Sequence, residues 1–301
     1  PEYKSTISRV GETENRKLQA IGGTALLQLG INGLLAGSFG SYLGLPDLFD
    51  TKTGKSGIGR LGLMDGQAMF SWSGLFPPEP SAWEKYFLEK KFNLGMLKII
   101  DVPPGEAIAN IPAVGLTTDL DTIYRVPVSA REYFLVENRN RDAMRNGSTV
   151  TMQYNGQTIQ KYFPRDTTNY NAFDQGAVFG VVTDIDEFDW SLPGGVTKEG
   201  IFYDGGILVW HIDENTIEAN LVSNSVNADP NRRGVDLEEA DGSQDIGQSY
   251  GFLNAGSGSE DGTSLDFYFD GNIAPVYKNE FGNNTHPNSM SYDMANSHIT
   301  I

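Results

Sequence analysis

The sequence predicts an α+β protein in which a helical N-terminal part precedes a long β-rich part. Two observations carry this prediction. Residues 24–42 and 80–95 are long apolar or amphipathic stretches typical of helices, whereas after Gly95 the apolar residues come in short β-branched and aromatic runs. Because the pattern of apolar residues changes there, we place a boundary between residues 1–95 and residues 96–301.

The first helix is expected over Thr24–Tyr42, buried on most sides, because no charged residue occurs between Leu18 and Pro46. Its four internal glycines would each weaken the helix by about 1 kcal/mol relative to alanine. Close packing of the helix against another element would explain why glycine occurs at these positions. Gly44 is expected to end it. Polar residues within the stretch favour a helix buried in protein over a membrane span.

The second helix is expected over Pro80–Gly95. Ser81 is a typical N-cap, and Glu84 follows three residues later, as in a capping box. The apolar residues of this segment lie on one helical face, which predicts an amphipathic helix packed on the body of the protein. They are Trp83, Phe87 and Leu88.

The β-rich part is expected to form a sheet or sandwich. Its strands are predicted at residues 96–102, 122–128, 132–139, 149–154, 177–185, 205–213 and 265–269.

The charge excludes some partners. The formal net charge is −17, so nucleic acid and anionic membrane surfaces, which need a basic footprint, are not expected to bind. An acidic surface suits bound cations such as Ca²⁺. The chain has no cysteine, which excludes disulfides, thiol catalysis and thiolate zinc sites.

Several segments resemble, in order, the immune inhibitor A family of secreted zinc metallopeptidases. "LGLPDLFD" resembles the run after that family's HExxH helix, and "GIGRLGLMDGQ" resembles its Met-turn. The resembling segments are Leu43–Asp50, Gly57–Gln67, Ser81–Gly95, Glu132–Asp142, Gly205–Glu214, Arg233–Asp245 and Thr285–Asp293.

The resemblance implies that residues 1–95 are the remnant of a zincin-type catalytic subdomain packed on a large β-rich, sandwich-like region. In HExxH, two histidines on one helical face bind zinc and the glutamate acts as general base. Counted back from "LGLPD", these positions carry Gly37, Ser41 and Ser38. The family's downstream acidic ligand falls on Asp47, and its Met-turn methionine on Met64. We therefore expect no catalytic zinc, which normally needs three protein ligands, and no peptidase activity.

Other catalytic chemistry has little support in the sequence. The histidines are His211, His286 and His298, and no two of them are four apart. His211 lies in an apolar strand, where a structural role is favoured over a ligand role, and His286 is expected at the surface. Ser38 and Ser41 lack the strand-to-helix turn of a serine hydrolase.

Calcium is the expected cofactor, because carboxylates at close spacing are what Ca²⁺ prefers. The alternative for the main cluster is a solvated acidic turn. The main candidates are Asp236, Glu238, Glu239, Asp241 and Asp245. Weaker candidates are Asp184, Asp186 and Asp189, together with Asp47 and Asp50.

Two further segments have open interpretations. Glu137, Arg139 and Arg141 share a strand face, where an ion-pair network that fixes the sheet register is favoured over contact with a substrate. The loop Phe70–Pro80 is aromatic and proline-rich. It would be a binding patch if exposed or a lid over the vacant site if buried.

Three functions remain open. The first is a secreted metallopeptidase-like protein that has lost its zinc site and serves in binding or extracellular assembly. The second is a structural subunit of an extracellular filament or surface layer, and the third is an active metallopeptidase whose metal site is completed by other residues. The expected location is outside a bacterial cell or at its surface, with protein partners or self-association. We expect the chain to be a fragment of a longer protein.

Overall fold

The computed structural model describes residues 19–21, 24–26, 32–66, 71–103, 105, 110–116, 120–164, 178, 181–196, 199, 201–251, 254 and 256–301. Few helices and several sheets make up these residues, so the chain is a β-rich α+β protein, as the sequence predicts. None of the described helices is long and apolar enough to cross a membrane.

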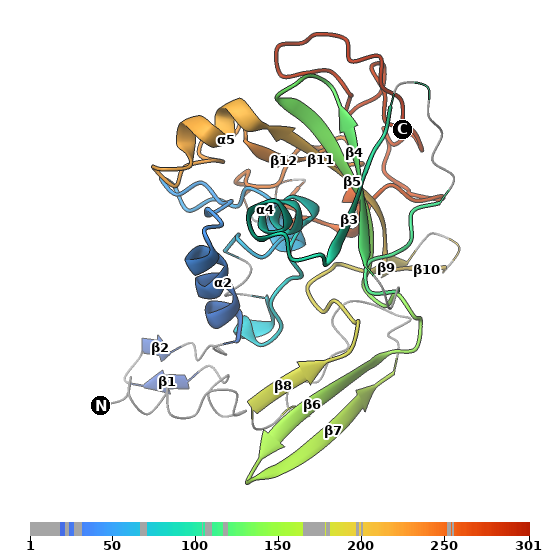
Figure 1. The fold of residues 1–301 in the computed structure, drawn as a ribbon. Coiled ribbons are helices and arrows are strands. Elements are labelled where there is room, and N and C mark those ends of the chain that lie inside the picture. Colours follow the sequence, from blue (N-terminus) through green and yellow to red (C-terminus); the bar gives the residue numbers. More distant parts are fainter. Residues whose placement is uncertain are drawn as a thin grey trace.

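A five-stranded mixed sheet forms the centre of the molecule, in the order β12-β11-β5-β4-β3 (Figure 1). The β3 and β4 strands are parallel, and the other neighbours are antiparallel. The strands are β3 (Leu97–Asp101), β4 (Asp121–Pro127), β5 (Glu132–Asn140), β11 (Gly205–Asp213) and β12 (Val235–Leu237). The predicted strands at 96–102, 122–128, 132–139 and 205–213 are therefore confirmed.

A second sheet has three antiparallel strands in the order β7-β6-β8. Its strands are β6 (Ser148–Tyr154), β7 (Gln157–Phe163) and β8 (Val181–Ile185), and the two-stranded pairs are β1 (Gln19–Ile21) with β2 (Thr24–Leu26) and β9 (Gly195–Val196) with β10 (Phe202–Tyr203). The strand predicted at 265–269 is wrong. Thr263 caps a 3₁₀ turn there, η5 (Ser264–Asp266), and Tyr268 forms only an isolated bridge to Ile207.

The second predicted helix is confirmed as α4 (Ala82–Phe92). Ser81 and Glu84 form the expected capping box, and Asn93 ends the helix in the left-handed conformation. The helix packs through Trp83 on the main core, which also contains Leu97 and Trp210 of the sheet. A short helix, α5 (Glu214–Asn220), follows β11 and is capped by Asp213.

The first predicted helix is wrong in extent and burial. Residues 24–26 form β2, and the helix α2 is Asn32–Leu43. Only Gly33 and Gly40 are buried on it. Glycine allows this close approach, since a Cβ on Gly40 would lie 2.7 Å from Met64 Sδ. The helix therefore packs through its small residues and leaves its large apolar side chains exposed.

Candidate functional site

The end of α2 positions one wall of a cavity. Gly44, with φ of +98°, closes the helix. Its N–H donates to Ser41 O at 2.9 Å, and the N–H of Leu45 donates to Gly40 O at 3.0 Å, which is a Schellman motif. The chain then turns back, and Leu48 N donates to Met64 O at 2.7 Å. The helix, the segment after it and the turn at Met64 are thereby brought together.

The cavity between these segments has a volume of about 250 Å³. It contains every position that the resemblance assigns to the former zinc site, and Met64 lies against α2 at Gly40. The lining residues are Gly33, Leu34, Gly37, Ser38, Ser41, Asp47, Phe49, Leu63, Met64, Asp65 and Gly66.

Two buried carboxylates hold the turn that carries Met64. Glu84 of α4 accepts the N–H groups of Leu63 and Met64, the latter at 2.6 Å. Asp65 accepts three donors from residues 56–58 and the N–H of Gly66. Burial raises the pKa of both carboxyls against the effect of these bonds. Asp65 thus lines the cavity with its oxygens already engaged by the turn.

Asp47 is held by Asn224, which the sequence did not single out. The Asn224 amide donates to Asp47 Oδ2 at 2.7 Å and accepts the N–H of Asp47 at 2.8 Å. Asn224 has φ of +51°, a conformation that asparagine tolerates better than most residues. This pair of bonds fixes one carboxylate oxygen of Asp47, and no described residue donates to the other.

The residues around the cavity do not fit a catalytic zinc. Such a site needs three protein ligands that converge on an open position. The described lining offers the carboxylate of Asp47, two serine hydroxyls and the engaged carboxylate of Asp65, but no histidine. Groups that bond to metal ligands orient those ligands and do not replace them.

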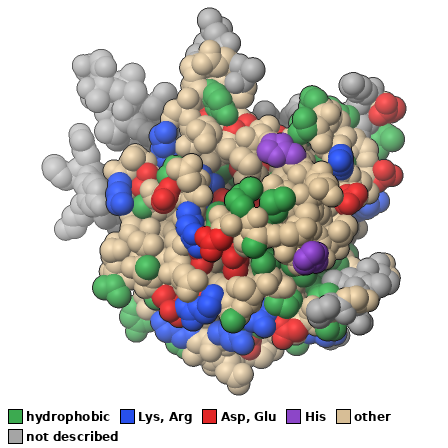
Figure 2. Space-filling model, turned by 90° about the horizontal axis from the view of Figure 1, so that it is seen from above, with side chains coloured by type: hydrophobic (Ala, Val, Ile, Leu, Met, Phe, Trp, Pro, Cys, Tyr) green, Lys and Arg blue, Asp and Glu red, His purple; other side chains and the backbone are tan. Residues whose placement is uncertain are grey.

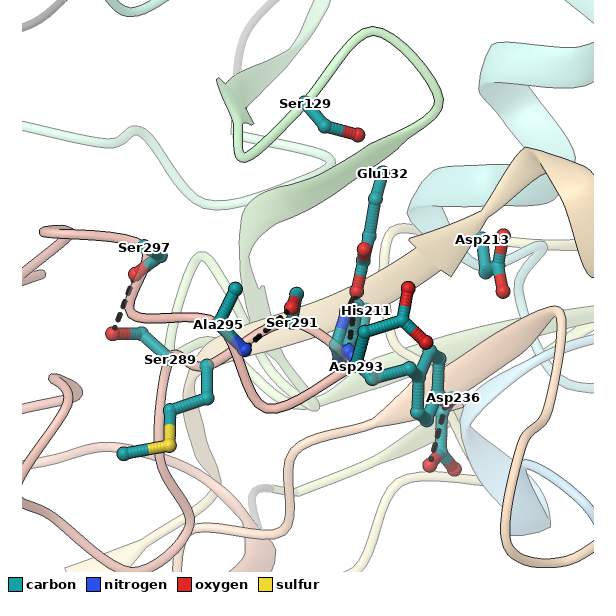
Figure 3. A network of polar contacts seen from close by, with 12 residues as sticks. Ser129, Glu132, His211, Asp213, Asp236, Ser289, Ser291, Asp293, Ala295 and Ser297 are labelled. Carbon is teal, nitrogen blue, oxygen red and sulfur yellow. Dashed lines mark hydrogen bonds and ion pairs between the residues drawn. The ribbon is translucent and has the colours of Figure 1, made fainter.

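The histidines lie elsewhere. His211 on β11 is buried, and its Nε2 lies 2.8 Å from Glu132 Oε1 (Figure 3). On the other side of the ring, Nδ1 lies 2.9 Å from Glu238 Oε1. Tyr292 stacks on its ring at 4.4 Å and donates its N–H to Glu132. Burial lowers the pKa of His211, but the two carboxylates outweigh this effect and raise it to about 9. The geometry therefore favours the structural role for His211.

The other two histidines are exposed, as expected for His286. Figure 2 shows histidine side chains on the face seen from above, where acidic and basic groups are interspersed.

Three carboxylates converge in a second place and Asp245 interacts with each of them; we call these four residues the acidic cluster. It contains Glu239, Asp241 and Asp245 from one loop and Asp266 from η5. One oxygen from each of Glu239, Asp241 and Asp266 lies within 4.8 Å of the others. Asp245 interacts electrostatically with all three. Its Oδ2 accepts the Ser259 hydroxyl at 2.7 Å, while its buried Oδ1 has no hydrogen-bond partner among the residues that the structure describes.

The acidic cluster is electrostatically unfavourable on its own. Burial, followed by the charge of Asp241, raises the pKa of Asp266 to about 8. Burial and the charge of Asp266 raise the pKa of Glu239 well above its usual range, and burial raises that of Asp241. A divalent cation held by Glu239, Asp241 and Asp266 would relieve this repulsion.

The other calcium candidates are used differently. Asp236 pairs with Arg233 at 2.8 Å, and Glu238 bonds His211 at 2.9 Å. Asp50 accepts the N–H of Lys52 within its own loop. Within the described ranges, Asp47 and Asp50 do not gather with a third potential ligand, and neither do Asp184, Asp186 and Asp189.

The charged residues that share a face of β5 form the ion-pair and hydrogen-bond network that the sequence favours over contact with a substrate. Glu137 is fully buried and accepts the indole N–H of Trp210 at 2.8 Å and the N–H of Ala82 at 3.2 Å. Arg139, also buried, donates to Leu61 O at 3.1 Å and pairs with Asp189. These bonds join β5 to β11, to α4 and to the 3₁₀ turn Gly59–Leu61.

The loop Phe70–Pro80 does not cover the cavity in its described part. Phe70 lies outside the described residues. Residues 71–74 form the 3₁₀ helix η3, and Leu75 and Phe76 are buried in the core of the three-stranded sheet. Phe76 stacks on Trp190 at 5.2 Å. None of residues 71–80 lines the cavity, so the lid interpretation is wrong for them.

A scan against protein-family models, a search of curated proteins and a search of solved structures each returned no match.

Proposed function

We propose that this chain is a metallopeptidase-like protein of the immune inhibitor A type that has lost its catalytic zinc site and serves in extracellular binding or assembly. The observation that carries the proposal is the cavity at α2. The segments that resemble the run after the zinc helix and the Met-turn meet there, and the helix carries Gly37, Ser38 and Ser41 where the chemistry needs two histidines and a glutamate.

The chemistry left in the cavity supports a binding role. A peptidase of this type needs a metal-activated water and a general base. A serine hydroxyl is not a base near neutral pH, and Asp47 alone supplies one metal ligand. What remains is a partly apolar cavity with one available carboxylate oxygen, which suits recognition.

The test of this proposal is incubation with casein and zinc, with and without a chelator. We expect no chelator-sensitive cleavage. Zinc-dependent cleavage that disappears in Asp47→Ala would overturn the proposal in favour of an active metallopeptidase. Cleavage that survives Asp47→Ala would have to come from another site or from a contaminant.

We also propose that the acidic cluster binds calcium. Two buried carboxylates with raised pKa values and the unpartnered Asp245 oxygen support it, because Ca²⁺ takes six to eight oxygen ligands. We expect native mass spectrometry to find calcium in the wild type and not in Asp266→Asn. The exposed Asp184→Asn is the matched control and should keep the ion. An unchanged metal content in Asp266→Asn would refute the assignment.

A structural subunit of a filament or surface layer is the second candidate, and β7 favours it. This strand is an edge of the three-stranded sheet, and five of its seven residues are exposed. An open edge is a template for pairing with another chain. Electron microscopy of the native protein should show concentration-dependent polymers that Ile159→Pro abolishes if this candidate holds, and monomers at all concentrations if it does not.

A further inference from the structure

The cavity at α2 is acidic and partly apolar. Its apolar lining comes from Leu34, Phe49, Leu63 and Met64. The ionisable groups among its described lining residues are both carboxylates, Asp47 and Asp65. A volume of about 250 Å³ lies below the range of about 300–1,000 Å³ for sites that take whole drug-sized ligands. The cavity therefore fits a single side chain with an apolar stem and a cationic end.

Asp47 is the carboxylate that can receive such a group. Asp65 already accepts four donors, whereas Asp47 uses Oδ2 for Asn224. In the part of the chain that the structure describes, no Lys, Arg or His pairs with Asp47, and nothing donates to its Oδ1. The C-terminal end of α2, which carries partial negative charge, borders the same cavity through Ser41. Both features favour a cation.

The surface beside the cavity indicates what carries this cation. Leu35, Phe39 and Tyr42 are spaced i, i+4 and i+7 on α2 and are 58%, 61% and 84% exposed. We call them the α2 stripe. Phe39 and Tyr42 stack with ring centroids 6.2 Å apart. Each stripe residue directly follows a residue that lines the cavity, namely Leu34, Ser38 or Ser41, so the stripe occupies the neighbouring face of the helix.

A free amine would use the cavity and leave the α2 stripe uncovered. A peptide would use both, because an apolar residue next to its basic residue would bury apolar area on the stripe, at about 25 cal/mol per Å². The exposed hydroxyls of Ser38 and Ser41 stand between the two surfaces, where they can bond the peptide backbone.

We propose that the cavity binds the lysine or arginine side chain of a peptide, with the stem against Leu63 and Met64 and the cationic end at Asp47 Oδ1. An apolar neighbour of that residue packs on the α2 stripe. This inference rests on the proposed function, since a catalytic zinc at Asp47 would occupy the same oxygen. Asn224 is a positioning residue, because it fixes the Asp47 carboxylate without lining the cavity.

The test is fluorescence anisotropy with labelled hexapeptides that differ at one position, which carries lysine, arginine, norleucine or glutamate beside a constant leucine. We expect the lysine and arginine peptides to bind at least tenfold more tightly than the norleucine peptide. Asp47→Asn should remove this preference and leave norleucine binding unchanged. Asn224→Ala should reduce it, and Asp50→Asn, in the same loop but outside the cavity, should not.

Several results would overturn the inference. Equal binding of lysine and norleucine peptides to the wild type would do so without any variant. A preference that survives Asp47→Asn would place the cation elsewhere. Competition by lysinamide as strong as that by the peptide would show that the α2 stripe does not contribute to binding. The casein assay on the same preparation separates the two proposals. Zinc-dependent cleavage refutes the proposed function, whereas absence of both cleavage and lysine preference refutes this inference alone.

Discussion

The acidic cluster predicts that the cation-free protein loses stability as the pH rises from 5 to 7. Burial and the neighbouring carboxylate raise the pKa of Asp266 to about 8, whereas an aspartate in an unfolded chain titrates near about 3.9. In this interval the folded cluster keeps a proton that the unfolded chain has released. Because the folded state binds more protons, the free energy of unfolding falls as the pH rises.

The magnitude follows from one proton. A difference of one bound proton changes the free energy of unfolding by about 1.4 kcal/mol per pH unit, or about 2.7 kcal/mol between pH 5 and 7. An average unfolding entropy per residue gives about 0.6 kcal/mol/K for this chain, so the melting temperature should fall by about 4 °C. Bound calcium requires ionised carboxylates and should cancel this loss. The stabilisation by calcium should therefore grow with pH.

The assay is calorimetry of metal-free protein at pH 5 and 7, repeated with saturating calcium. Asp266→Asn removes one acid from the cluster, so the metal-free variant should lose most of the pH dependence and gain less from calcium. Asp184→Asn should behave as the wild type does. An identical pH dependence in the metal-free wild type and in Asp266→Asn would refute the electrostatic reasoning.

Three further predictions concern the scaffold. The folded pKa of His211 is about 9 and exceeds its ordinary value, so its contribution to stability should be complete below about pH 6.5 and be lost as the pH rises through about 9. Urea unfolding with saturating calcium should show this loss as about 3 kcal/mol in the wild type and not in His211→Gln. A Cβ on Gly57 would lie 1.9 Å from Leu48 O, so Gly57→Ala should cost about 1–3 kcal/mol in urea unfolding and weaken peptide binding at the cavity; unchanged stability would contradict this packing. Ser81→Ala should cost about 0.5–2 kcal/mol because it removes the N-cap of α4, whereas a stability equal to that of the wild type would show that the capping box contributes nothing.

The features that sequence predicts well here are those whose causes are local. The capping box of α4 needs only Ser81 and Glu84, three positions apart. Continuous apolar runs predict the β5 and β11 strands, which pair over nine residues. The end of α2 follows from Gly44, which adopts the left-handed conformation that the Schellman motif requires.

The features that sequence misses depend on contacts between distant segments. The lack of charge around α2 predicts burial, but the helix contacts Met64 through Gly40, and its large apolar residues lie exposed. Asp266 joins the acidic cluster from 25 positions beyond Asp241, and no spacing rule connects them. Asn224 meets Asp47 across 177 positions. In the run from Asp236 to Asp245, closeness in sequence misled, because Asp236 and Glu238 bond Arg233 and His211 instead.

We propose that the α2 cavity keeps the geometry of a zinc site without its ligands. The most direct measurement is zinc uptake by isothermal titration calorimetry for the wild type and for the triple variant Gly37→His, Ser38→Glu and Ser41→His, each with and without Asp47→Ala. We expect no Asp47-dependent zinc binding in the wild type and one zinc per chain in the triple variant, lost with Asp47→Ala. One zinc per chain in the wild type that Asp47→Ala removes would contradict it.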